Sequence, residues 1–201
     1  MTRVLSWNLL RHVGAGPQDL AGLIEHHRPD MVAMQEATEG TGDVTRLVGG
    51  SYTWHPMPNR SHGVAAWWPG PPGEHGVVHL PHSTSPGNDD RRLCLLTQVN
   101  GLHVGIVHLC HDPILQRRQL REACGLVQGD GLVVGDMNML GPPLVPGWRE
   151  LGPWRPTHMA CGWVPVRIDR CLARGWPRAA MARALPRGPS DHRPILLDVA
   201  R

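Results

Sequence analysis

The stretch Leu132-Val133-Val134-Gly135-Asp136-Met137-Asn138 limits the possible folds more than any other part of the sequence. Its three apolar residues, two of them β-branched, predict a strand that is buried on both faces and ends at Gly135. Open α/β sheets bind their ligands just past the carboxyl ends of such strands. We therefore expect Asp136 to accept a proton from water and Asn138 to orient that water or a substrate oxygen. A turn that merely ends the strand is the alternative.

Two further polar residues follow predicted strands near the N-terminus. Residues 3–7 predict a strand ending at Asn8, residues 17–27 a helix that starts at a proline, and residues 31–35 a second strand ending at Glu36. A strand–helix–strand unit is normally parallel, so Asn8 and Glu36 should lie at the same edge of the sheet. Oxygen ligands of this type suit Mg²⁺.

Asn100-Gly101 predicts a type I′ hairpin turn between two apolar strands, and it is the clearest local signal in the chain. With that turn, Arg91 projects from the same face as His108. A β-bulge would put Arg92 there instead, so both arginines remain candidates.

The remaining segments complete an alternating α/β pattern. We expect strands at 52–54, 62–68, 75–80, 92–99, 102–109, 157–159, 164–172 and 194–199, a helix at 114–127, a loop at 81–90 and a helical turn near Trp148. Asp169 places a carboxylate in an otherwise apolar strand, and that charge needs a partner. Asp191 and His192 are neighbours on an extended chain and point opposite ways, so we expect each to have its own partner.

Composition indicates one globular domain covering residues 1–201. The chain is 41% hydrophobic and 18% charged, without an apolar run of the roughly 18 residues that span a bilayer. Five cysteines without a CxxC pair predict free thiols. No secretory signal is evident, so we expect the protein in the cytoplasm. We also expect a monomer that binds no membrane. The net charge of +3 allows an anionic substrate without requiring a polymer.

Taken in order, these residues resemble the endonuclease/exonuclease/phosphatase superfamily, which has the fold of deoxyribonuclease I and the abasic-site endonucleases. The resemblance runs from Asn8 to the last strand and therefore covers nearly the whole chain. Its most specific part is Gly135-Asp136-x-Asn138 followed by Ser190-Asp191-His192-Arg193-Pro194. The resemblance implies an α/β fold: a four-layer sandwich of two packed mixed β-sheets flanked by helices.

The resemblance also implies a metal site and a water-activating pair. Glu36 would be the principal Mg²⁺ ligand, with Asn8 and Asp191 nearby, and Mn²⁺ would be an alternative ion. Asp136 would position or deprotonate the attacking water, and Asn138 would hold that water or a phosphate oxygen.

The phosphate-binding residues follow from the same resemblance. His192 would contact the scissile phosphate and would be oriented by Asp169, which raises the pKa of the imidazole and favours its cationic form. His108 would be a second histidine on the phosphate side. Arg91 or Arg92 would contact the substrate phosphate.

The sequence departs from the family at two of these positions. Leu10 stands where some nucleases carry another carboxylate, which argues against a two-metal site, and Arg170 stands where an aromatic residue is common. The chain is short for the family, so we expect trimmed DNA-gripping loops.

Three functions remain open on these grounds. The first is a Mg²⁺-dependent phosphodiesterase, a nuclease that cleaves DNA or RNA by in-line attack of an activated water. The second is a phosphatase or phosphodiesterase acting on a small phosphorylated metabolite. The third, which the filled chemical positions disfavour, is a catalytically silent binding protein on the same fold.

Overall fold

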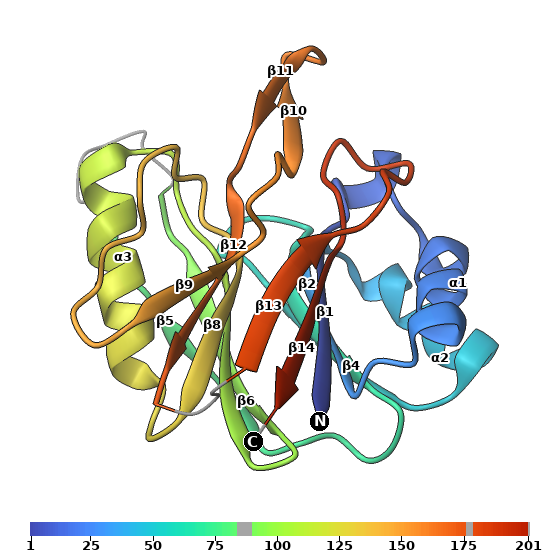
Figure 1. Cartoon of the computed structure of the whole chain (residues 1–201). Coiled ribbons are helices and arrows are strands. Elements are labelled where there is room, and N and C mark those ends of the chain that lie inside the picture. The colour runs from blue at the N-terminus through green and yellow to red at the C-terminus, as the bar shows by residue number, and fades with distance from the viewer. Residues whose placement is uncertain (84–89, 176–178, 201) are drawn as a thin grey trace.

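Two six-stranded β-sheets pack face to face, with helices on their outer faces, in the computed structural model of the chain (Figure 1). The structure describes residues 1–83, 90–175 and 179–200. Its helices are η1 (Arg11–Val13), α1 (Pro17–His27), η2 (Glu39–Asp43), α2 (Val44–Val48) and α3 (Pro113–Leu126). Its strands are β1 (Thr2–Asn8), β2 (Met31–Ala37), β3 (Ser51–Pro56), β4 (Gly63–Trp68), β5 (His75–His79), β6 (Leu93–Val99), β7 (Leu102–His108), β8 (Gly131–Asp136), β9 (Arg149–Gly152), β10 (His158–Ala160), β11 (Val164–Val166), β12 (Asp169–Arg174), β13 (Ala179–Ala184) and β14 (Ile195–Ala200).

The strand order is β13-β14-β1-β2-β4-β3 in the first sheet and β5-β6-β7-β8-β12-β9 in the second. Helices α1 and α2 cover the outer face of the first sheet, and α3 covers the outer face of the second (Figure 1). The short hairpin of β10 and β11 projects beyond one end of the sandwich (Figure 1). This arrangement confirms the predicted four-layer α/β sandwich.

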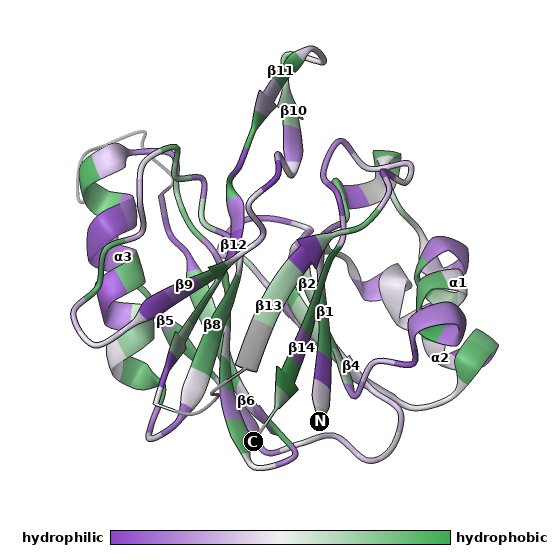
Figure 2. Cartoon of the chain, viewed as in Figure 1, coloured by the Kyte–Doolittle hydropathy of each residue, from purple (hydrophilic) through white to green (hydrophobic). Residues whose placement is uncertain are grey.

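Alternation along the strands explains why the molecule has three apolar layers. In β1, Val4 packs between the two sheets, whereas Leu5 packs under the helices of the first sheet. In β8, Leu132 and Val134 face the layer between the sheets, and Val133 faces α3. A strand with apolar residues on both faces is stable only inside such a stack. In Figure 2, β14 is mostly hydrophobic, while α1 and α3 carry hydrophobic and hydrophilic residues.

Parallel pairing brings the carboxyl ends of four strands to the same end of the sandwich. Strands β1 and β2 pair in parallel with Asn8 opposite Gln35, and β7 and β8 pair in parallel with His108 opposite Asp136. Helices α1 and α3 make these two connections. The predicted hairpin is also confirmed, because Val99 pairs with Leu102 and Asn100-Gly101 adopts positive φ angles of 50° and 75°.

Several predicted boundaries are wrong because pairing partners decide them. Strand β8 continues through Asp136, which pairs with Asp169 of β12, instead of ending at Gly135. The single strand expected at 164–172 is two strands, because β11 pairs with β10 in the projecting hairpin whereas β12 pairs with β8.

Two edge strands of the sheets were not predicted at all. The segment near Trp148, expected as a helical turn, leads into β9, which pairs with β12. Strand β13 is rich in alanine, a residue that favours helices, and its pairing with β14 overrides that propensity. Of the loop expected at 81–90, residues 84–89 lie outside the described residues.

No helix in the described parts of the chain is long and apolar enough to cross a membrane.

Gly135 is the position where the fold of the site tolerates no side chain. Its φ is 138°, and an added Cβ would lie 2.1 Å from the backbone oxygen of Val107 in the neighbouring strand. We expect Gly135→Ala to lower the free energy of unfolding by about 2–4 kcal/mol, measured by chemical denaturation.

Gly76→Ala is the matched control, because Gly76 lies in strand β5 and its added Cβ would meet nothing within 4 Å. That substitution should change the free energy of unfolding by no more than about 0.5 kcal/mol. Equal losses in the two variants would contradict the steric explanation.

Candidate active site

The buried carboxylate of Asp136 joins the two sheets at the end of the sandwich. Its Oδ2 accepts a hydrogen bond of 3.0 Å from Nδ2 of Asn8, which ends β1 in the opposite sheet. Its Oδ1 accepts a bond of 2.9 Å from the backbone N–H of Asn138. Asn138 has a φ of 50°, a left-handed conformation that asparagine tolerates, and its Nδ2 donates to the Leu109 carbonyl at 2.9 Å. Both carboxylate oxygens are therefore oriented.

Two histidines approach the same Asp136 oxygen from different elements. Nε2 of His108, at the end of β7, lies 3.7 Å from Oδ2, and Nε2 of His192, just before β14, lies 3.8 Å from it. Both rings are buried. The register of β7, β8 and β12 explains this convergence, because it places Asp136 between His108 and Asp169.

Asp169 is the partner that fixes the orientation of His192. Nδ1 of His192 donates to the Asp169 carboxylate, at 2.8 Å from Oδ2 and 3.0 Å from Oδ1. The backbone N–H of Asp169 donates to the hydroxyl of Thr157 at 3.0 Å. The backbone N–H of His192 donates to the hydroxyl of Ser190, which itself donates to the Asn8 carbonyl at 2.7 Å. The His192 ring is therefore held with Nε2 facing Asp136.

The two histidines carry different charges. Burial by itself lowers the pKa of His192, but the carboxylates of Asp169, Asp136 and Asp191 outweigh it and raise that pKa to about 9. Burial lowers the pKa of His108 well below its ordinary value, and the charges of Arg92 and His192 add to this effect. At neutral pH, His192 is therefore cationic and His108 neutral.

Burial also raises the pKa of Asp136, and the neighbouring Asp169 carboxylate adds to the shift, bringing the pKa to about 7. Two carboxylates in one buried site repel each other, so the charge of His192 between them is part of what makes the site stable.

Glu36 enters the site from a β-bulge at the end of β2. It is the extra residue between Gln35 and Ala37 in the pairing with β4, and its φ is 52°. A bulge turns a side chain out of the regular alternation. Oε1 of Glu36 lies 4.0 Å from Nε2 of His108, and Oε2 accepts a bond of 2.9 Å from Nε of Arg11. Glu36 thus faces the site and already has a cationic group beside it.

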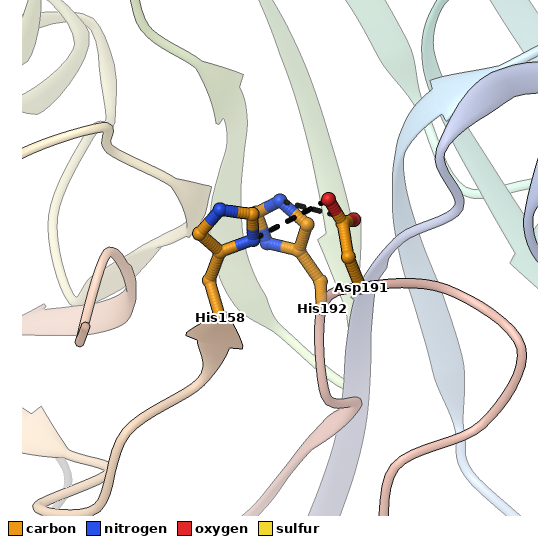
Figure 3. Close-up of side chains that lie close together, drawn as sticks. All are labelled: His158, Asp191 and His192. Atoms are coloured by element: carbon orange, nitrogen blue, oxygen red, sulfur yellow. Dashed lines mark ion pairs between the residues drawn. The ribbon is translucent and has the colours of Figure 1, made fainter. Parts of the chain in front are cut away.

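The structure places Asp191 next to two imidazoles. Its Oδ1 lies 3.8 Å from Nε2 of His192, and its Oδ2 lies 3.7 Å from Nδ1 of His158 (Figure 3). Within the described residues, two groups of three His, Cys, Asp or Glu residues bring their ligand atoms within 4.8 Å of one another. These groups are Asp136, Asp169 and His192, and His158, Asp191 and His192. Glu36 belongs to neither group.

The arginine on the His108 side is Arg92. It is buried just before β6, and its charge adds to the effect of burial in lowering the pKa of His108 and of the exposed His111. Nη1 of Arg92 donates to the Arg91 carbonyl at 3.2 Å. The structure therefore favours Arg92 of the two arginines that the sequence leaves open.

Arg170, which stands where the family commonly has an aromatic residue, holds the loop that follows Asn138. Its buried guanidinium donates through Nη1 to Oε1 of Glu150 at 2.9 Å and through Nη2 to the Met139 carbonyl at 2.8 Å. The charge is therefore paired and hydrogen-bonded, which a buried arginine requires.

Sequence reasoning missed three residues of this site, His62, His158 and Arg11. His62 is buried just before β4, and burial lowers its pKa while Glu36 opposes that shift. The chain has 13 histidines. No spacing in the sequence distinguishes His62 and His158 from the other histidines, because each reaches the site through a loop or hairpin.

The model of the Endonuclease/Exonuclease/phosphatase family matches residues 5–192 of the chain. A search of curated proteins returned no match. Solved structures do share the fold. A TDP2 structure from D. rerio complexed with single strand DNA product has a TM-score of 0.74 at 16% identity, covering 98% of this chain and 99% of that one.

Two bacterial structures are similar to the same degree. The mannosyl-6-phosphatase Bt3783 of Bacteroides thetaiotaomicron VPI-5482 has a TM-score of 0.73 at 15% identity, covering 100% of both chains. A functionally unknown conserved protein from Enterococcus faecalis V583 has a TM-score of 0.77 at 16% identity, covering 99% of both chains. Together with the family model and the converging polar site, these likenesses lead to one conclusion: the chain belongs to the endonuclease/exonuclease/phosphatase family.

Proposed function

We propose that this protein is a Mg²⁺-dependent phosphoester hydrolase, and that it acts as a phosphodiesterase on DNA or RNA. One observation carries the proposal: Asn8, His108 and His192, from three distant parts of the chain, surround a single oxygen of Asp136 within 4 Å. In-line attack on a phosphoester needs an aimed water, donors for the phosphoryl oxygens and a source of positive charge. This cluster of side chains supplies the first two.

Side chains that offer oxygen atoms as ligands are present for the divalent ion. Glu36, with Asn8 and Asp191 nearby, would hold Mg²⁺ or, in its place, Mn²⁺. The fit is supported by Oδ1 of Asp191, which is buried and has no hydrogen-bond partner among the described residues. The ion, when bound, supplies positive charge that stabilises the phosphoryl oxygens.

The protein residues divide the remaining work by charge and geometry. Asp136 orients a water molecule and takes its proton, while Asn138 fixes the carboxylate through its backbone N–H. The cationic His192 donates from Nε2 to a phosphate oxygen, because Asp169 occupies its Nδ1. His108 and Arg92 lie on the phosphate side of the cluster, and Arg92 provides a permanent positive charge.

Substrates of two sizes fit these features. A nucleic acid is supported by the TDP2 structure that carries a single strand DNA product. A small phosphorylated metabolite is the second candidate. It is supported by the likeness to a mannosyl-6-phosphatase and by the mild net charge of +3.

Asp136→Asn keeps the shape of the side chain but removes the base. We expect kcat to fall about 10³-fold or more, while the thermal unfolding curve stays nearly unchanged. The matched control is Asp43→Asn, at an exposed position before α2, which should retain full activity. Hydrolysis by Asp136→Asn at the wild-type rate would contradict the assigned role.

Glu36→Gln tests the metal ligand. The Mg²⁺ concentration that gives half-maximal activity should rise by about ten-fold or more, because a ligand charge is lost. Removal of divalent ions by a chelator should abolish wild-type activity, and added Mg²⁺ should restore it. Glu25→Gln, on the exposed face of α1, should leave the Mg²⁺ dependence unchanged. An unaltered Mg²⁺ requirement in Glu36→Gln would remove Glu36 from the proposed site.

Salt dependence separates the two substrate classes. Binding of a single-stranded nucleic acid weakens steeply with ionic strength, by about 300-fold or more between about 50 and 200 mM salt when about six or more phosphates are contacted. We expect KM for single-stranded DNA or RNA to rise steeply over this range, in a panel that includes nucleotides and sugar phosphates. Turnover confined to the small phosphoesters, with a nearly flat salt response, would instead identify a metabolite phosphatase.

A further inference from the structure

A second cluster of metal-binding side chains lies beside the proposed catalytic centre. It consists of Nδ1 of His158, the carboxylate of Asp191 and Nε2 of His192, all within 4.8 Å of one another (Figure 3). Asp191 lies beside both imidazoles, with Oδ2 3.7 Å from Nδ1 of His158 and Oδ1 3.8 Å from Nε2 of His192. Mg²⁺ binding as proposed above makes no use of either imidazole.

Two atoms of this cluster are buried and unsatisfied. Nδ1 of His158 and Oδ1 of Asp191 have no hydrogen-bond partner among the described residues. Leaving a buried polar group unsatisfied is costly, so native proteins usually pair such groups with a ligand, a water or another residue. The ligand atoms of the cluster lie within 4.8 Å of one another, so a single ion could contact all three side chains.

The donor set selects the chemical class of that ligand. Two imidazole nitrogens and one carboxylate oxygen are the protein ligands of many open zinc sites, whereas Mg²⁺ prefers a set made only of oxygens. Three ligand atoms within 4.8 Å of one another are close enough to contact one cation.

Asp169 orients one of these ligands in the way that metal sites require. A metal-binding histidine almost always donates its second ring N–H to a carboxylate or a carbonyl. Nδ1 of His192 donates to Asp169 at 2.8 Å, which leaves Nε2 directed at the cluster.

The backbone holds the two histidines together without a ligand. His158 and His192 form an isolated antiparallel bridge, and their ring centroids are 4.2 Å apart. On either side of that bridge, the backbone N–H of Met159 donates to the Asp191 carbonyl and that of Arg193 to the Thr157 carbonyl. The base of the projecting hairpin is thereby fixed against the loop before β14, so the site is preorganised.

We propose that His158, Asp191 and His192 bind a Zn²⁺-class transition-metal ion at a site that shares only Asp191 with the proposed Mg²⁺ site. Metal binding replaces the proton that His192 carries on Nε2, and that proton is released to solvent. The ion is then bound to Nε2 of His192, the atom that otherwise donates to the substrate phosphate. Bound Zn²⁺ therefore inhibits hydrolysis. The inhibition rests on the proposed function, whereas metal binding does not.

The test measures metal binding directly, with excess Mg²⁺ present throughout. Zn²⁺ is titrated by calorimetry, and Co²⁺ is used as a visible-absorption probe, without any substrate. The variants are His158→Phe, which keeps a ring against His192, and His158→Gln as a second substitution in case the first fails to fold. His79→Phe, at an exposed position in β5, is the control for the other histidines.

We expect the wild type and His79→Phe to bind one Zn²⁺ per chain. With Co²⁺, both should show the visible absorption bands of an ion in a low-symmetry coordination site. Both His158 variants should bind Zn²⁺ about 100-fold more weakly, because even the loss of a residue that only supports a ligand costs about 10- to 100-fold. Relative to its own rate without Zn²⁺, Mg²⁺-supported hydrolysis by His158→Phe should lose its sensitivity to Zn²⁺.

Wild-type protein that binds no Zn²⁺, or His158 variants that bind it as tightly as the wild type, would overturn the metal site. An equal loss in His79→Phe would do the same. If binding follows the expected pattern but no phosphoester is hydrolysed, the metal site stands and the proposed function is wrong.

Discussion

The hydrogen bond between Asn8 and Asp136 is the interaction on which the rest of the site depends. It joins residues 128 positions apart, at the ends of β1 and β8, and it connects the two sheets. It forms only if both parallel strand pairs point the same way and the apolar layer between the sheets sets the right spacing. The large apolar interior therefore positions a polar contact of 3.0 Å.

Burying this many charged groups costs stability, and the site offsets the cost by pairing. Asp169 and Asp136 share the imidazolium of His192, Glu36 is paired with Arg11, and Arg170 donates hydrogen bonds to Glu150 and two carbonyls. The pKa of His192 near 9 and the pKa of Asp136 near 7 are two results of one arrangement. Groups held in unusual protonation states inside a stable frame are typical of catalytic sites.

His192 takes part in both proposals, phosphoester hydrolysis and Zn²⁺ binding. Through Nδ1 it belongs to the frame of β8 and β12, and through Nε2 it faces both Asp136 and Asp191. The projecting hairpin adds His158 to one side of the ring only. The same imidazole can therefore serve a phosphate when protonated and a transition metal when deprotonated, but never both together.

The sequence by itself predicted the buried strands and named most of the residues that the structure brings together around Asp136. The apolar runs before Asn8, Glu36 and Asp136 predicted the buried strands, because burial on both faces leaves an unbroken apolar pattern. Asn100-Gly101 predicted the hairpin because only certain residues tolerate its dihedral angles.

Tertiary structure alone decided which side chains meet. The bulge that aims Glu36, the choice of Arg92 and the pairing of His158 with His192 depend on partners far away in the chain. Edge strand β13 likewise exists only because β14 lies beside it. The secondary-structure propensity of a short segment does not depend on such partners, because hydrogen bonding and burial between distant segments arise only once the chain has folded.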